Sequence, residues 1–209
     1  GADFKIGIGP NLTLEATVNP DFGQIEADPA EVNLSGFETF FGERRPFFIE
    51  GSNLLTGETN NFFYSRRIGG TPTGPADGDY VDYPGTSTIL GAAKLTGRLS
   101  SGTSIGALGA VTGDEFARTS TDGLFGETRV TPRAYWGVTR VQQEFGSQGS
   151  TAGAQITAMH RDFAADDPLA SRLTRTAITG AMDSRMRFRN RTYETSLSAG
   201  FTYVEGEPA

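Results

Sequence analysis

Long segments of alternating residues, separated by very short turns, constrain the fold of this chain more than any other feature. In the clearest segment, small and apolar residues occupy every second position: Ile89, Gly91, Ala93, Leu95, Gly97 and Leu99. The positions between them include Lys94 and Arg98. After a turn at Ser101-Gly102, the next segment repeats the pattern with Ile105, Ala107, Gly109 and Val111. This period of two predicts adjacent antiparallel strands, with Lys94 and Arg98 facing inward.

The same pattern recurs along the chain. Further strand pairs are expected in DFKIGIG with LTLEATV, in PRAYWGVTRVQQEFG with STAGAQITAMHRDF, and in RTAITGAMDSRMRFRN with RTYETSLSAGFTYVEG. Each of these strands is expected to reach about ten residues or more, whereas strands of soluble domains average five or six and strands that cross a bilayer need about nine to eleven. The turns SSG, GSQG and RNR are short, while residues 113–130 and 162–175 form long polar loops. Short turns at one rim and long loops at the other are typical of outer-membrane barrels.

Aromatic and charged residues follow the same alternation. Tyr135-Trp136 and Phe145, and Tyr193 and Phe201-Tyr203, lie near strand ends, as in the aromatic girdles of membrane proteins. One segment carries four charged residues on one side, namely Asp183, Arg185, Arg187 and Arg189. Because ionised side chains are costly to bury without partners, that side must face water. The water is either a barrel lumen or bulk solvent, and periodicity does not distinguish the two.

Residues 19–51 interrupt the alternation. Pro20, Pro29 and Pro46 exclude a continuous strand or helix through this stretch. Its charges exclude lipid, where each costs about 2 to 4 kcal/mol at the midplane; they are Asp21, Glu26, Asp28, Glu31, Glu38, Glu43, Arg44, Arg45 and Glu50. Its phenylalanines, which include Phe40, Phe41, Phe47 and Phe48, disfavour open water. We therefore expect the stretch to fold into a barrel lumen as a plug or constriction, with its rings on small interior residues.

Two roles are open for the arginines of this region. In one, Arg44, Arg45, Arg66 and Arg67 only form ion pairs that hold the inward loop in place. In the other, these arginines line an eyelet opposite Asp21, Glu26 and Asp28. The residues expected to face the lumen or its constriction are Asp21, Glu26, Asp28, Glu43, Arg44, Arg45, Glu50, Arg66, Arg67, Lys94 and Arg98.

Length and composition narrow the remaining options. The 209 residues suit one domain, with an irregular lumenal and loop region at 19–87 and a hairpin meander at 88–209. A net charge of −7 disfavours a nucleic-acid partner. The absence of cysteine excludes disulfides, thiolate metal sites and cysteine nucleophiles.

Other chemistries receive less support. Glu26, Glu31, Glu43 and Glu50 are candidates for a glycosidase pair, but nothing singles out two of them. His160 has no GxSxG elbow to accompany it. Asp21, Glu26, Asp28 and Glu31 offer oxygen ligands for Ca²⁺, yet their spacing matches no EF-hand loop. We therefore expect a protein that is not an enzyme and has no cofactor, with Ca²⁺ as the alternative.

The sequence also resembles a known family. The resemblance is carried by LTLEATVNPDFGQIEADPAEVNLSGFETFFGERRPFFIEG, FFYSRRIG, ILGAAKLTGR, GVTRVQQEFG and SAGFTYVEGEPA. These stretches closely resemble bacterial proteins whose C-terminal region is a domain of unknown function predicted to be an outer-membrane β-barrel. In that family the barrel usually follows a family-nine-like carbohydrate-binding domain. The resemblance implies that this chain is a piece of a larger barrel.

The expected fold is all-β, an antiparallel meander of long strands that forms part of a transmembrane β-barrel. The expected function is that of a pore, an uptake channel or the membrane anchor of a carbohydrate-binding module in the bacterial outer membrane. Its partners would be the lipid bilayer and an oligosaccharide or other small solute. The alternative is a secreted soluble β domain that binds or hydrolyses glycans. A barrel requires a continuous outward apolar band, expected to include Ile89, Ala93, Leu95, Leu99, Ile105, Ala107 and Val111.

Overall fold

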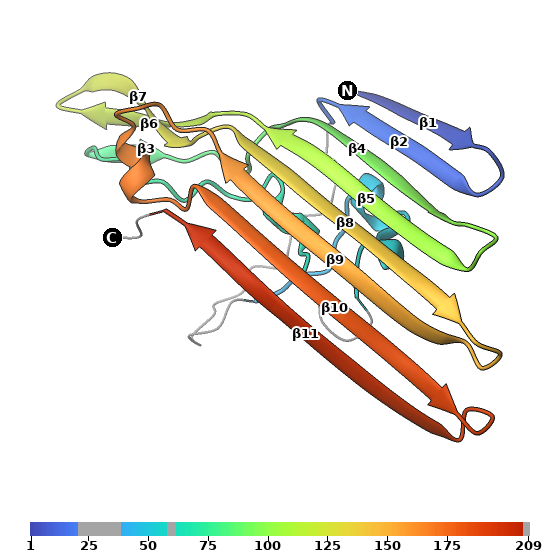
Figure 1. Ribbon diagram of the computed structural model, residues 1–209. Helices are drawn as coiled ribbons and strands as arrows, with labels where there is room; N and C mark the ends of the chain where they lie inside the picture. Colours follow the sequence, from blue (N-terminus) through green and yellow to red (C-terminus); the bar gives the residue numbers. More distant parts are fainter. Residues whose placement is uncertain (21–38, 58–61, 207–209) are drawn as a thin grey trace.

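The chain folds into a large antiparallel sheet that carries irregular segments on one face (Figure 1). The computed structural model describes residues 1–20, 39–57 and 62–206. The sheet has eight strands, in the order β1 (Ala2–Ile8), β2 (Leu12–Val18), β4 (Ile89–Arg98), β5 (Thr103–Thr112), β8 (Ala134–Phe145), β9 (Ser150–Arg161), β10 (Thr176–Phe188) and β11 (Tyr193–Glu205). This all-β antiparallel meander confirms the expected class. Among the residues that the structure describes, the sheet is open, since β1 pairs with β2 alone and β11 with β10 alone.

The connections differ in length at the two ends of the sheet. Short turns join β1 to β2, β4 to β5, β8 to β9 and β10 to β11, and these turns gather at one end (Figure 1). The long connections lie at the other end, which we call the loop end. A second sheet of three strands lies there, formed by β3 (Tyr80–Asp82), β6 (Glu115–Thr121) and β7 (Leu124–Thr131).

The expectation that residues 113–130 form a loop was wrong. They build the β6–β7 hairpin, which turns at Asp122 and Gly123, both with positive φ. Much of this hairpin is exposed on both faces. Its sequence therefore lacks the apolar alternation by which a half-buried strand is recognised.

The strand register divides the eight-stranded sheet into two unlike faces. We call the face that carries the irregular segments the covered face, and the opposite one the open face. On the open face, three consecutive rows cross all eight strands without a charged residue. The middle row consists of Ile6, Leu14, Leu95, Ala107, Thr139, Ile156, Gly180 and Phe201. The covered face is polar, and its buried residues include Glu15, Lys94, Thr96, Arg140 and Gln155.

The hydrophobic core lies between the covered face and the irregular segments. Three short helices belong to these segments: α1 (Pro46–Ile49), η1 (Ser52–Leu54) and η2 (Ser65–Arg67). Phe48, Leu55 and Ile68 supply their side of the core. The sheet contributes Ile89, Ala92, Leu108, Ala110 and Val138. Small residues on the strands thus leave room for the rings of the segment.

Close backbone packing fixes the position of η1. A Cβ atom on Gly106 of β5 would lie 2.2 Å from the carbonyl oxygen of Leu54. Glycine at this position therefore lets the 3₁₀ turn rest directly on the sheet.

Two expected side-chain positions were wrong. Ile89 was expected on the outward band, but it is buried in the core, because the register shifts between Ile89 and Gly91 where β4 pairs with β5. Such a bulge moves a side chain to the other face. Phe40 was expected to pack inside, but it is 66% exposed and meets the ring of Tyr64 edge-on. No helix in the described part of the chain is long and apolar enough to span a membrane.

Candidate functional site

The irregular segments are fastened to the sheet through a buried lysine. Lys94 of β4 lies on the covered face, with its side chain fully buried. Its ammonium group donates to the carbonyl oxygens of Phe47 at 2.6 Å and Glu50 at 2.5 Å. The carboxylate of Glu15 lies 2.5 Å away and supplies the counter-charge. The cation also lies 4.9 Å from the ring centroid of Phe47. Lys94 therefore holds α1 against the sheet. Its side chain points toward the irregular segments, which is the inward orientation expected from the sequence.

A second polar cluster connects the irregular segment that carries α1 and η1 to the irregular segment that carries η2. Arg45 donates to both carboxylate oxygens of Glu43, at 2.8 Å and 2.7 Å. Ser65 donates to the same carboxylate at 2.6 Å. Arg45 also donates to the carbonyl of Ile68 at 2.6 Å. Burial raises the pKa of Glu43, but hydrogen bonds from Arg45 and Ser65 outweigh burial and lower it to about 2. This carboxylate is therefore ionised and structurally engaged at neutral pH.

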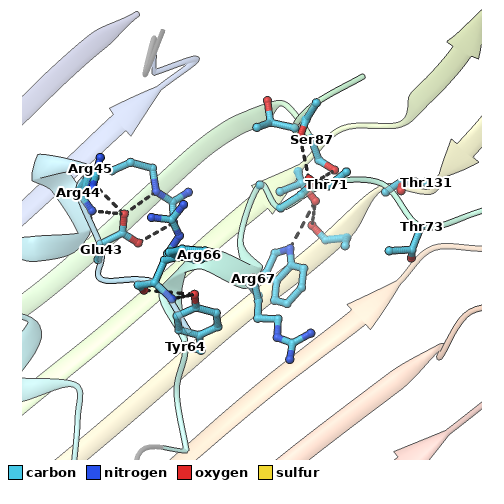
Figure 2. A pocket seen from close by; sticks show the side chains of 18 of the residues that line it. Glu43, Arg44, Arg45, Tyr64, Arg66, Arg67, Thr71, Thr73, Ser87 and Thr131 are labelled. Carbon is cyan, nitrogen blue, oxygen red and sulfur yellow. Dashed lines mark hydrogen bonds and ion pairs between the residues drawn. The ribbon is translucent and has the colours of Figure 1, made fainter. Parts of the chain in front are cut away.

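A pocket of about 760 Å³ opens beside this cluster (Figure 2). Its walls come from the irregular segments and from the loop end of β5, β8 and β9 on the covered face. Five arginines line it, namely Arg44, Arg45, Arg66, Arg67 and Arg161. Glu43 is the single carboxylate among its described lining residues. The described lining is therefore rich in arginine, although the whole chain has a net charge of −7.

Hydroxyl groups and aromatic rings complete the pocket wall. In the view of Figure 2, Glu43 and its neighbouring arginines lie on one side, and Thr71, Ser87 and Thr131 lie on the other. Trp136 also lines the pocket, and its indole N–H donates to the hydroxyl of Thr112 at 3.4 Å. The pocket wall therefore combines guanidinium groups, hydroxyl groups and aromatic rings, which are polar and apolar surfaces of the kind that line small-molecule sites.

A buried ion pair crosses the covered face farther from the loop end. Arg140 of β8 donates to both carboxylate oxygens of Asp183 on β10, at 2.6 Å and 2.9 Å. The guanidinium passes over Gly153 of β9, where a Cβ atom would lie 2.6 Å from it. Glycine at this position therefore leaves space for the pair.

The structure brings together some of the expected site residues and separates others. Glu43, Arg44, Arg45, Arg66 and Arg67 share the pocket, whereas Glu50 and Lys94 belong to the anchoring cluster with Glu15. Arg98 lies at the short-turn end, where it meets Glu144 at 2.5 Å. Asp21, Glu26 and Asp28 lie outside the described residues, so the expected eyelet opposite them stays a prediction.

Sequence reasoning missed several residues of this face. Trp136 was expected beside Tyr135 in an aromatic girdle, but neighbouring strand residues point to opposite faces, and Trp136 lies in the pocket. Arg161 and Arg140 were not singled out. The alternation of β8 would have placed Trp136 and Arg140 together on the face opposite Tyr135. No signal in the sequence indicates that Arg161 lines a pocket.

The other chemistries considered from the sequence gain no support from the pocket. Paired-carboxylate hydrolysis requires a second acid, and the described lining offers Glu43 alone, already bound by Arg45 and Ser65. Within the described residues, no three histidine, aspartate or glutamate side chains cluster as metal ligands. The oxygens considered for Ca²⁺ lie in the stretch that the structure does not describe.

Most of the chain matches a family of related proteins. Residues 1–199 match the family described as "Domain of unknown function (DUF5916)". The chain belongs to this family. No curated protein and no solved structure matches the chain. Membership in the family assigns no activity, so function has to be argued from the sheet and its pocket.

Proposed function

We propose that this member of the family forms part of the wall of a β-barrel in the bacterial outer membrane, with an inward segment that narrows a solute pathway. One observation carries the proposal, namely the uncharged open face that crosses all eight strands. Two rows flank the middle row described above. They consist of Phe4, Ala16, Ala93, Gly109, Gly137, Ala158, Ile178 and Tyr203, and of Ile8, Leu12, Gly97, Ile105, Val141, Ala154, Met182 and Ala199.

The open face carries large apolar side chains that no described segment covers. Ile156, Met182 and Phe201 are 59%, 70% and 64% exposed, respectively. Contiguous apolar patches of this extent are rare on soluble monomers and mark a surface that contacts protein or lipid. A soluble sheet would bury such a face against a second layer. Lipid can cover a face of this width without a complementary protein shape, which supports the proposal.

The height of the apolar face also fits a bilayer. On β8, Tyr135 and Phe145 lie ten positions apart on the open face, and Tyr193 and Tyr203 bracket β11 in the same way. Ten positions span about 33 Å along a strand, which becomes about 25 Å at the usual barrel tilt. The apolar band of outer-membrane barrels has this height and is bordered by aromatic residues at both ends.

The covered face has the opposite character and suits an aqueous lumen. It carries the ion pairs of Lys94 with Glu15 and of Arg140 with Asp183. The charges of the irregular segments, such as Glu43 and Arg45, are on the same side. In a barrel these groups keep their polar partners on the lumenal side of the wall, while the rings of the segment pack on small strand residues.

Lipid imposes one further requirement on the open sheet. Unpaired backbone groups are costly in hydrocarbon, so both edge strands need partners there. A closed wall therefore requires β1 and β11 to pair with each other or with additional strands.

Single cysteines test which face meets lipid, and these 209 residues contribute no native cysteine to the labelling. In vesicles that contain the full-length protein, nitroxide labels at Ala154, Ile156 and Ala158 should collide with lipid-soluble oxygen. Labels at Thr157 and at the exposed Thr202, which lies in the same row of the covered face, should instead collide with a water-soluble nickel chelate. Equal access of the nickel chelate to all five positions would contradict the proposal and favour a soluble β domain.

Planar-bilayer recording separates a channel from a membrane anchor. Deletion of residues 20–50 should raise single-channel conductance if the inward segment narrows a pathway. Arg44→Glu with Arg45→Glu should shift ion selectivity toward cations. If both the intact and the deleted protein insert without conducting, the barrel serves as an anchor. Heat-dependent gel migration provides the folding control for each variant.

A further inference from the structure

The short-turn end of the large sheet carries unpaired positive charge on the β10–β11 hairpin. Arg185 and Arg187 of β10 share the carboxylate of Glu194 on β11, at 3.3 Å and 2.9 Å. Arg189 and Arg191 follow in the β10–β11 turn, where both are exposed. In the described part of the chain, neither of these two residues forms an ion pair with a carboxylate. Two cations therefore remain after the neighbouring acid has been used.

The β8–β9 turn holds this arginine-bearing turn in a fixed conformation. The two turns lie next to each other (Figure 1). The backbone N–H of Arg191 donates to the side-chain oxygen of Gln148 at 3.2 Å, and its Nε donates to the carbonyl oxygen of the same residue at 3.1 Å. Arg189, Asn190 and Arg191 all have positive φ, which residues with a side chain rarely adopt. The contacts with Gln148 fix Arg191 and leave its two terminal nitrogens without a hydrogen-bond partner among the described residues.

Aromatic residues border the apolar open face at the same end. Phe145, Phe188 and Tyr193 are exposed on that face. The guanidinium carbon of Arg189 lies 5.9 Å from the ring centroid of Tyr193. In a membrane protein, an aromatic border of this kind lies at the level of the lipid headgroups. With the open face in lipid, Arg189 therefore lies at the level of the phosphate groups.

The loop end of the sheet has the opposite charge. Residues 75–88, 113–133 and 162–175 carry ten acidic residues and five arginines. An anionic lipid surface attracts exposed arginines and repels an excess of carboxylates. A planar guanidinium also matches the oxygens of a phosphate group, to which it can donate two parallel hydrogen bonds. Of the two ends, the short-turn end is therefore the one that fits anionic lipid.

We infer that the short-turn end binds the phosphate groups of anionic phospholipids, with Arg189 and Arg191 as the residues that contact them. The inference rests on the proposed function, because it requires the open face to lie in a bilayer. It adds to that function a lipid preference and the end of the sheet that carries it. Because Gln148 already fixes the turn, little conformational freedom is lost when a headgroup binds.

Spin-labelled lipids test the inference in the full-length protein. A fluorophore is attached at Ser147→Cys, an exposed position in the β8–β9 turn, and the protein is placed in phosphatidylcholine vesicles. Phosphatidylglycerol or phosphatidylcholine with a nitroxide near the headgroup is then included at increasing mole fractions, and fluorescence quenching is recorded. We expect half-maximal quenching at a mole fraction about threefold lower for phosphatidylglycerol than for phosphatidylcholine.

Charge variants assign the preference to the turn. Arg189→Gln with Arg191→Gln should remove most of the difference between the two lipids. Arg118→Gln with Arg172→Gln is the matched control, because it removes two exposed arginines of the loop end, and the difference should persist. Arg189→Gln alone leaves the contacts between Arg191 and Gln148 intact. This single variant should reduce the difference, and it decides if the double variant does not fold.

Three outcomes would contradict the headgroup site. Equal quenching by both lipids would overturn it and leave the membrane barrel untouched. An equal loss of preference in the two double variants would overturn it too, because that result would reflect net charge alone. No quenching by either lipid, with the protein folded, would contradict the barrel itself and with it the inference that rests on the barrel.

Discussion

Lys94 and Glu15 face each other across two neighbouring strands, with 2.5 Å between the ammonium nitrogen and a carboxylate oxygen. Both side chains are almost completely buried. The same ammonium group also binds two carbonyl oxygens of the irregular segment. One side chain therefore connects the sheet, the buried charge of β2 and the segment that lies on the covered face.

We predict that Lys94→Met lowers the free energy of unfolding by about 3 to 5 kcal/mol, because it leaves the Glu15 charge and two carbonyl groups short of a donor. Lys5→Met is the matched control. Lys5 also contacts Glu15, at 2.8 Å, but its side chain is 54% exposed, so its loss should shift the unfolding midpoint only slightly. Urea titration in lipid vesicles, followed by Trp136 emission, measures both. Similar shifts of the unfolding midpoint for the two variants would contradict the anchoring role of Lys94.

The pair of Arg140 and Asp183 predicts strong coupling between two strands that are not neighbours. Arg140→Met and Asp183→Leu should each destabilise the protein by about 3 kcal/mol or more, since each leaves a buried charge unpaired. The double variant should lose much less than the sum of the single losses. A double-mutant cycle of unfolding free energies gives the coupling, and additive losses would contradict the described geometry.

Two glycines on the same strand test the contact between the sheet and η1. Gly106→Ala should destabilise the protein by about 1 to 3 kcal/mol, because its Cβ would overlap the carbonyl of Leu54 and push the 3₁₀ turn away. Gly109→Ala places its Cβ 3.8 Å from the nearest neighbouring atom, so it should be tolerated. Limited proteolysis within residues 50–57 provides a second readout. Equal tolerance of both substitutions would mean that η1 does not rest on β5.

The carboxylate of Glu43 predicts a stability that depends on pH. Its pKa falls from an ordinary 4.5 to about 2 in the folded protein. An acid whose pKa is lower in the folded protein than in the unfolded protein stabilises the folded state. This stabilisation is complete above the pKa of the unfolded state and is lost as the pH falls through the pKa of the folded state. The shift corresponds to about 3 kcal/mol, present at pH 6 and lost between about pH 4.5 and pH 2. Glu43→Gln should lack this contribution, so the stability difference between the two proteins should shrink as the pH falls through this window. A difference independent of pH would contradict the described hydrogen bonds.

The sequence by itself determined the strand pattern. Alternation in segments such as 89–98 and 103–112 was sufficient to predict adjacent antiparallel strands with Lys94 inward, because the side-chain period of a strand is two and is read locally. The prolines of 19–51 likewise indicated that regular structure would not continue there, and Pro46 begins a helix of only four residues. These features depend on neighbours along the chain, which the sequence displays directly.

Only the tertiary structure decided where the irregular residues meet. Ile89 entered the core through a register shift that its sequence does not mark, and Phe40 stayed exposed although its neighbours pack inside. The pocket joins Glu43, Arg67, Trp136 and Arg161, which come from segments far apart in the chain. Such contacts depend on where the irregular segments pack on the covered face. Their position is determined by packing between distant parts of the chain and by charged partners such as Lys94. A local period carries no information about either.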